Sequence, residues 1–298
     1  MKLKKIAATV VMTTTIATMA TAQTGHEFSI GVGGGLASLM HKPQIDLYLG
    51  GVAGLGYTYF FNEHWGIGTG VEVSQYKGKF NLQYFDESYN AYDGYNNFKY
   101  NYELFDFIET QQAVLVNIPL MMRYVSGMFY FSVGGKAGIP LNARFENSAA
   151  RIVASGYYDE FNLILHDPMF MGFGEFKNQR NRSKFDMKTV FSASLEFGFR
   201  WRLGHKKILY TGIYADYGIT DGKPDGAVKL IPYNASNNYY PNSVVAAAAN
   251  GKTLTDKLSP FAAGLKLSIA FGNDLEPKAA RAAEEAIAKP GKKATNRW

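Results

Sequence analysis

Few residues in this sequence have the type and spacing that catalysis or metal binding requires. His166 and Asp167 are adjacent, and an acidic residue beside a histidine could make a general base for hydrolysis. Adjacent side chains rarely orient each other, however, and the sequence identifies no nucleophile or water site for them. The other histidines are scattered without metal-ligand spacing, at His26, His41, His64 and His205. We therefore predict no catalysis, no metal and no cofactor.

Composition excludes further classes of protein. The chain has no cysteine, which rules out a disulfide framework, a thiolate metal site and a cysteine nucleophile. The stretch "GVGGGL" at Gly31–Leu36 has the glycines of a dinucleotide-binding loop, but no helix follows it, and strand glycines facing a crowded interior fit better. The net charge of +6 comes partly from the two ends of the chain, and no basic stripe predicts a nucleic-acid partner.

The amino terminus has the order of regions of a secretory signal peptide. Lys2, Lys4 and Lys5 precede an uncharged segment, Ile6–Met19, and "ATA" at 20–22 offers small residues for cleavage. The alternative is a short buried helix at a cytosolic terminus. No later run reaches about 18 apolar residues, so a membrane-embedded mature chain would have to be a closed β-barrel.

The mature sequence alternates with a period of two, which indicates strands. In "VFSASLEFGFRWRL" (Val190–Leu203), aromatic and aliphatic residues take one face, and Ser, Gly and charged residues take the other. Eight segments show this pattern. They are His26–Leu39, Leu47–Phe61, Trp65–Leu82, Thr110–Val125, Phe129–Phe145, Lys184–Leu203, Ile208–Ile219 and Lys257–Phe271.

The connections between these segments alternate between tight turns and loops of 25 residues or more, apart from one short loop near "MHKPQI". Long loops argue against a compact soluble domain but are usual on one side of a transmembrane barrel. We predict an all-β fold, an eight-stranded antiparallel up-and-down transmembrane β-barrel with both termini in the periplasm. A soluble sandwich or a lipocalin-like barrel remains the alternative, because alternation alone does not assign inside and outside.

Charge placement favours the membrane barrel. Seven charged residues lie mid-strand on the small-residue face, where they would form an ion-pair network that fixes strand register inside a filled lumen: Glu72, Arg123, Lys136, Glu196, Arg200, Asp216 and Lys266. We expect Glu72 beside Arg123, and Glu196 facing Asp216 with Arg200 nearby. Aromatic residues gather beside the tight turns, as in an interfacial girdle: Tyr57, Tyr59, Phe61, Trp65, Tyr124, Phe129, Phe199 and Trp201.

Three motifs carry a family resemblance: "VNIPLMMRY" (Val116–Tyr124), the following "FYFSVGGKAGIPL", and "GLKLSIAFG" near the end. With them, Glu27–Gly272 resembles the outer-membrane β-barrel domain proteins of Bacteroidota, the group that includes PorT-like proteins. The last motif is similar to the β-signal read by barrel-assembly machinery, through Gly264, Leu267, Ile269 and Phe271. The further 27 residues resemble the arrangement of OmpA-type proteins, although no peptidoglycan-binding domain is present. We divide the chain into a signal peptide (1–22), a barrel (23–272) and a short helical or disordered periplasmic tail (273–298).

Function would then lie in the loops or the tail. The loop 83–108 is rich in tyrosines that suit a binding surface, although the favoured interpretation is that it prolongs the hairpin and folds on its neighbours: Tyr84, Tyr89, Tyr92, Tyr95, Tyr100 and Tyr102. Loop 146–183 is apolar enough to plug the barrel mouth or contact a partner, whereas loop 221–256 gives no chemical signal. We predict a structural or accessory outer-membrane protein whose partners are lipid, the assembly machinery and an envelope protein. A receptor or adhesin, a narrow channel and a small enzyme are the alternatives.

Overall fold

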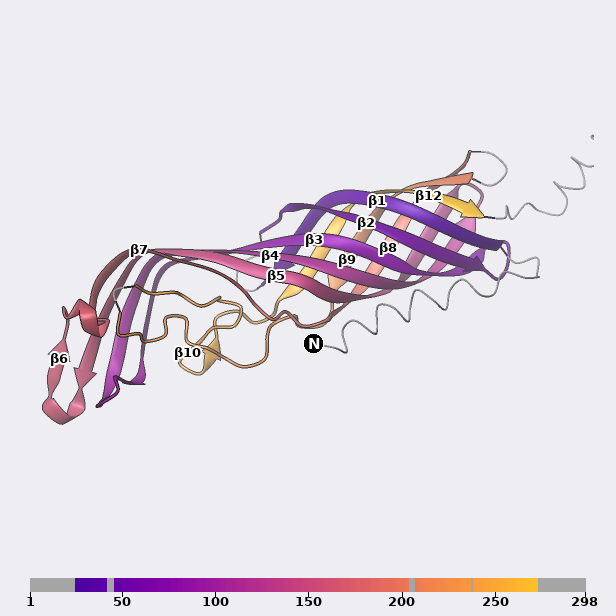
Figure 1. Ribbon diagram of the computed structural model, residues 1–298. Coiled ribbons are helices and arrows are strands. Elements are labelled where there is room, and N and C mark those ends of the chain that lie inside the picture. The colour runs from indigo at the N-terminus through magenta and orange to yellow at the C-terminus, as the bar shows by residue number, and fades with distance from the viewer. Residues whose placement is uncertain (1–24, 42–45, 204–206, 237, 273–298) are drawn as a thin grey trace, which may run out of the picture.

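Eight strands form a closed barrel in the computed structural model, which describes residues 25–41, 46–203, 207–236 and 238–272 (Figure 1). Each strand pairs antiparallel with its neighbours, and the last returns to the first, with Gly264 opposite Gly35 at the closing seam. The barrel strands are β1 (Gly25–Met40), β2 (Leu49–Phe60), β3 (Trp65–Tyr92), β4 (Asn97–Ser126), β5 (Phe129–Tyr158), β8 (Val190–Arg202), β9 (Lys207–Gly218) and β12 (Ser259–Gly272). The predicted fold class is confirmed.

Three of these strands continue far beyond the barrel. We predicted that β3 ends at Leu82, that β4 begins at Thr110 and that β5 ends at Phe145, and all three predictions are wrong. The strands extend to 92, from 97 and to 158, and β7 (Gly174–Lys184) pairs with the outer half of β5. We call this continuation, with the segment that joins β5 to β7, the extension; in Figure 1 it curves away from the barrel at the left.

Short elements complete the chain. The end of the extension holds the 3₁₀ turns η1 (Asp159–Phe161) and η2 (Met169–Met171), with β6 (Leu163–Leu165) between them. A two-stranded ribbon, β10 (Ala248–Ala249) and β11 (Lys252–Thr253), lies in the long connection 219–258, which we call the covering loop. Within the described ranges, no helix has the length and apolar character needed to cross a membrane.

The side-chain pattern inverts along single strands. In the barrel the outward face is apolar, as Leu120, Phe197 and Leu267 show, and this surface forms an apolar belt. On the extended part of β4 the apolar residues instead point inward, where Tyr100, Leu104 and Phe107 are buried. Beyond Val114 the outward face of β4 becomes mostly polar, with Ile108 as an exposed apolar residue. The barrel therefore has the pattern expected in lipid, and the extension has the pattern expected in water.

The covering loop supplies part of the core of the extension. Its Leu230, Ile231 and Val244 are fully buried in one cluster with the inward residues of β3, β4, β5 and β7. The Tyr89 hydroxyl donates to the Ile231 carbonyl at 2.9 Å and accepts from the Tyr233 N–H at 2.7 Å. Figure 1 shows this loop beneath the curved sheet. A segment with no chemical signal in the sequence thus holds the extension together.

Candidate functional site

The centre of the barrel holds a chain of buried ion pairs. Lys136 on β5 reaches Glu72 on β3 at 2.8 Å and Asp216 on β9 at 2.9 Å. Ser194 Oγ donates a further hydrogen bond to Asp216 at 2.5 Å. β5 pairs with neither β3 nor β9, so the two ion pairs of Lys136 connect strands across the lumen.

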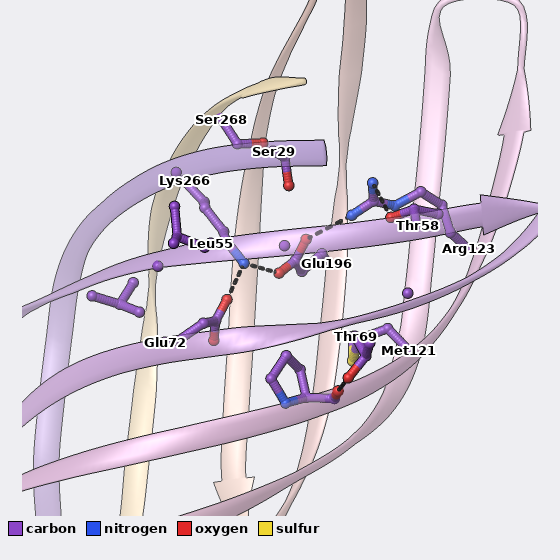
Figure 2. A pocket seen from close by; sticks show the side chains of 16 residues that line it. Ser29, Leu55, Thr58, Thr69, Glu72, Met121, Arg123, Glu196, Lys266 and Ser268 are labelled. Atoms are coloured by element: carbon purple, nitrogen blue, oxygen red, sulfur yellow. Dashed lines mark hydrogen bonds and ion pairs between the residues drawn. The ribbon is translucent and has the colours of Figure 1, made fainter. Parts of the chain in front are cut away.

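A second lysine continues the chain toward the tight turns (Figure 2). Lys266 on β12 donates to Glu72 at 2.7 Å and also to Glu196 on β8. Arg123 does not pair with Glu72 as we predicted; its Nη2 lies 4.0 Å from Glu196, and its other nitrogens donate to Ser132 and Thr58. The strand register separates the two predicted partners, because Arg123 lies opposite Gly66 whereas Glu72 lies opposite Asn117.

Arg200 pairs with a residue that the sequence analysis missed. Its Nη2 lies 4.0 Å from Oε1 of Glu27, and the Tyr210 hydroxyl donates to Oε2 of Glu27 at 2.8 Å. The expected proximity of Arg200 to Glu196 is not among these contacts. Glu27 alternates in phase with the inward residues of β1, so its position in the strand was the signal that could have found it.

The lumen is balanced in charge and filled. Addition of Glu27 to the predicted acids gives four carboxylates, Glu27, Glu72, Glu196 and Asp216, which face the four cations Arg123, Lys136, Arg200 and Lys266. The cavity beside Arg123, Glu196 and Lys266 measures about 60 Å³, which is room for a few water molecules. An eight-stranded barrel leaves an interior only wide enough for side chains.

The six predicted tyrosines separate into two groups. Tyr100 and Tyr102 are fully buried in the extension, and Tyr89 packs against the same core. Tyr84, Tyr92 and Tyr95 are exposed, and Tyr95 is the most open at 89%. Residues 83–108 are therefore a continuous hairpin and not a free loop, and only the exposed group could contact a ligand.

A second buried polar cluster lies where the barrel meets the extension, and no sequence motif indicated it. The Glu109 carboxylate is fully buried and accepts from Gln111 Nε2 at 2.8 Å and Ser243 Oγ at 2.6 Å. It also accepts from the Val244 N–H at 3.0 Å and Asn147 Nδ2 at 3.3 Å. Two of these four donors belong to the covering loop, so Glu109 attaches that loop to β4.

Burial sets the protonation of this cluster. It raises the pKa of Glu109 above its ordinary value of 4.5, against the opposing effect of the four hydrogen bonds. His41 Nε2 donates to Gln111 Oε1 at 3.3 Å, and burial lowers the pKa of His41 below 6.5. Both residues lie beyond the apolar belt. The junction therefore favours neutral side chains.

Comparison with known families agrees with this architecture. Residues 21–222 match the family model described as "Outer membrane protein beta-barrel domain", which is more than half of the chain. The chain belongs to this outer-membrane β-barrel family. Among solved structures, Ail, the attachment invasion locus protein of Yersinia pestis, is similar over 83% of this chain and 97% of its own, with 10% identity and a TM-score of 0.27. No curated protein matches.

Membership of the outer-membrane barrel family assigns the apolar belt to the lipid bilayer. Beside the tight turns, the predicted girdle residues Trp65 and Tyr124 contact each other with ring centroids 4.8 Å apart. Phe129 contacts Phe199 at 5.2 Å, and Trp201 contacts Phe199 at 6.0 Å. These aromatic pairs suit the interface between lipid and water.

The four residues predicted to form an assembly signal lie on the closing strand of this outer-membrane barrel, and their recognition stays a prediction. Leu267, Ile269 and Phe271 face outward from β12, and Gly264 faces inward at the seam with β1. The predicted signal peptide (1–22) and tail (273–298) lie outside the described residues. The proposed division at 23–272 stays a prediction.

The residues first considered for catalysis are not assembled into a site. His166 and Asp167 are both exposed between β6 and η2. Among the described residues, no group of three or more His, Asp or Glu side chains is placed to hold a metal ion. The glycines of "GVGGGL" lie in β1, with no helix after them to make a nucleotide site.

Proposed function

We propose that this outer-membrane barrel is a non-catalytic structural or accessory protein of the cell envelope, and that the end of its extension contacts a partner protein. In this proposal the termini and tight turns are periplasmic, the extension is extracellular, and β12 is recognised by the assembly machinery during insertion. The finer resemblance to PorT-like proteins of Bacteroidota stays a prediction.

One observation carries the proposal: an apolar surface at the end of a well-packed extension. Five exposed apolar residues cluster in η1, β6 and η2, and we call them the apolar tip. They are Phe161, Leu163, Ile164, Met169 and Phe170. Phe170 alone is 76% exposed. Exposed apolar side chains that gather within ten residues, 161–170, at the end of a packed support are typical of protein interaction sites.

A receptor or adhesin function is the second candidate, because Tyr84, Tyr92 and Tyr95 expose aromatic rings along the β3–β4 hairpin. Tyrosine gives a large contact area at low entropy cost, which suits glycan or protein ligands. A channel is disfavoured because the lumen charges are paired and the space beside them is small. We expect no single-channel conductance steps in planar bilayers.

Affinity purification from solubilised outer membranes tests the proposal. Three forms are compared with the wild type: Phe161→Ser with Phe170→Ser, Tyr92→Ser with Tyr95→Ser, and a chain that lacks 274–298. We expect an envelope protein to be lost with the apolar tip variant alone. Loss only with the tyrosine variant, together with glycan or host-protein binding by the wild type, would favour the adhesin. Retention of every partner by the apolar tip variant would contradict the proposal that the apolar tip contacts a partner protein.

A further inference from the structure

Basic side chains form a band on the outward face of the sheet where the barrel passes into the extension. Three neighbouring rows of the sheet carry them: Lys77 with Arg144 and Lys184, then Lys79 with Arg182, then Arg180. We call these six residues the cationic belt. The register pairs join them across four adjacent strands, so the charges form one surface.

This surface lies directly beside the lipid-facing part of the barrel. The continuous outward apolar run of the barrel ends at Val73 on β3, Val114 on β4 and Leu141 on β5, with Ile108 an isolated exposed apolar residue beyond it. Along β3 the next outward residues are Gln75 and then Lys77. The cationic belt therefore stands at the level where lipid hydrocarbon gives way to headgroups.

The belt also encloses a cavity with hydrogen-bond donors. A space of about 300 Å³ is lined by Arg144, Arg180 and Arg182 together with Thr110 and Ser148. Nε and Nη2 of Arg144 donate to Gln112 Oε1 at 3.3 and 3.0 Å, which fixes the direction of that guanidinium. Guanidinium and hydroxyl groups converging on one space are suited to phosphate oxygens.

Little negative charge compensates the belt. In the described part of the chain its one ion pair joins Arg182 Nε to Glu146 Oε2 at 4.0 Å, and both side chains are about two-thirds exposed. Such an exposed pair contributes little. Glu146 is also the one acidic residue in these three rows of the sheet. The surface is thus left with a positive excess.

We propose that the cationic belt binds the phosphate group of an anionic lipid headgroup at the rim of the barrel. Protection of a sheet edge is a simpler reason for some of these charges, because β7 pairs with β5 alone among the described strands. The outer part of β3 is likewise an edge, because its pairing with β2 ends at Ser74. Edge protection does not account for Arg144, since β5 pairs with both β4 and β7 at that position. Binding of a lipid phosphate accounts for all six residues of the cationic belt.

Native mass spectrometry of the full-length folded protein in detergent tests this inference. The probes are phosphatidylglycerol, phosphatidylcholine and inorganic phosphate. One belt variant carries Arg144→Gln and Arg180→Gln, and the other carries Lys77→Gln and Lys79→Gln. The matched control carries Lys99→Gln and Lys177→Gln, two exposed outward lysines of the same sheet that lie farther from the apolar belt.

We expect the wild type to prefer phosphatidylglycerol, and each belt variant to bind it roughly tenfold more weakly while the control matches the wild type. Heat-modified mobility on gels checks that every variant is folded. Equal binding of both lipids, or equal loss in belt and control variants, would overturn the proposal. Inorganic phosphate that binds as tightly as the lipid would overturn it too, because the site would then be one for a free anion.

Discussion

Lys136 and Glu72 face each other across the barrel lumen, with Nζ and Oε2 2.8 Å apart, from strands that do not pair with each other. Neither group has free access to water, because both side chains are less than one-tenth exposed. The same lysine also holds Asp216, and the same glutamate also accepts from Lys266. These two residues are thus the branch points of the ion-pair chain.

Glu72→Ala removes one branch point and leaves Lys136 with one fewer counter-charge. Loss of one partner of a buried pair costs about 3–5 kcal/mol, so we expect the free energy of unfolding to fall by an amount in this range. Urea titration of the folded barrel in bilayers, read by heat-modified gel mobility, measures it. Asp225→Ala is the control, since Asp225 is 92% exposed in its pair with Lys188 and such a pair contributes at most about 1 kcal/mol. An equal effect of both substitutions would contradict the role of the lumen pairs.

Gly264→Ala tests how tightly the barrel seam closes. A methyl group at this position would collide with the Gly34 carbonyl oxygen on β1, so we expect a loss of about 1–3 kcal/mol and a lower yield of folded barrel. Gly34→Ala is the matched control, because its nearest neighbour would be the Gly50 carbonyl oxygen at 3.7 Å. Refolding into detergent micelles compares the two without assembly machinery. Similar yields would mean that the seam tolerates the methyl group.

Glu109→Ala should release the covering loop from the sheet. Each buried donor left without an acceptor costs about 1–3 kcal/mol, and two of the lost acceptor contacts serve Ser243 and Val244. We expect faster protease cleavage within 219–258 while barrel mobility on gels is unchanged. Glu103→Ala, an exposed position on the same strand, should cleave at the wild-type rate. Slow cleavage in both variants would show that the apolar core alone holds the loop.

The same carboxyl group gives loop attachment a pH dependence. Because burial raises the pKa of Glu109, the folded state binds more protons than the unfolded state above pH 4.5. The contribution of Glu109 to the stability of the folded state is therefore complete below pH 4.5 and is lost as the pH rises through the raised pKa. His41 acts in the opposite direction, since its lowered pKa costs stability as pH falls below 6.5.

Hydrogen-exchange protection of the Val244 N–H, corrected for the intrinsic rate, separates the two groups. In wild type we expect a component that decreases with rising pH above 4.5, and we expect this component to vanish in Glu109→Gln. The decrease in protection below pH 6.5 that depends on His41 should remain in the Glu109→Gln variant. Identical profiles for the two proteins would exclude Glu109 as the titrating group.

The barrel could be predicted from sequence because lipid on one side and a filled lumen on the other enforce strict alternation. The ends of β3, β4 and β5 could not be predicted, because the apolar residues change from the outward face to the inward face where these strands leave the apolar belt. On β4 the phase also shifts by one residue at Asp106, whose φ of 49° marks a local irregularity, so the inward set changes from Leu104 to Phe107. Alternation counted from Val125 backward fails at that point.

The ion-pair partners were harder to predict than the set of lumen residues. Alternation along a strand determines which side chains point inward, and all seven predicted charged residues lie in the lumen network. Which cation meets which carboxylate depends on the stagger of the strands and on side-chain length across the lumen. Glu109 is different again, because its donors come from a covering loop that has no periodic pattern.

The uninterrupted passage of β3, β4 and β5 from bilayer to extension fixes how far the protein reaches. The part of β5 from Leu141 to Tyr158 measures roughly 55 Å along the strand at about 3.3 Å per residue. The strands continue from the barrel into the extension without a break, with irregularities at Asp106 and between Val114 and Leu115 of β4. The length along β5 is an upper bound on the reach of the extension, because the extension curves away from the barrel (Figure 1).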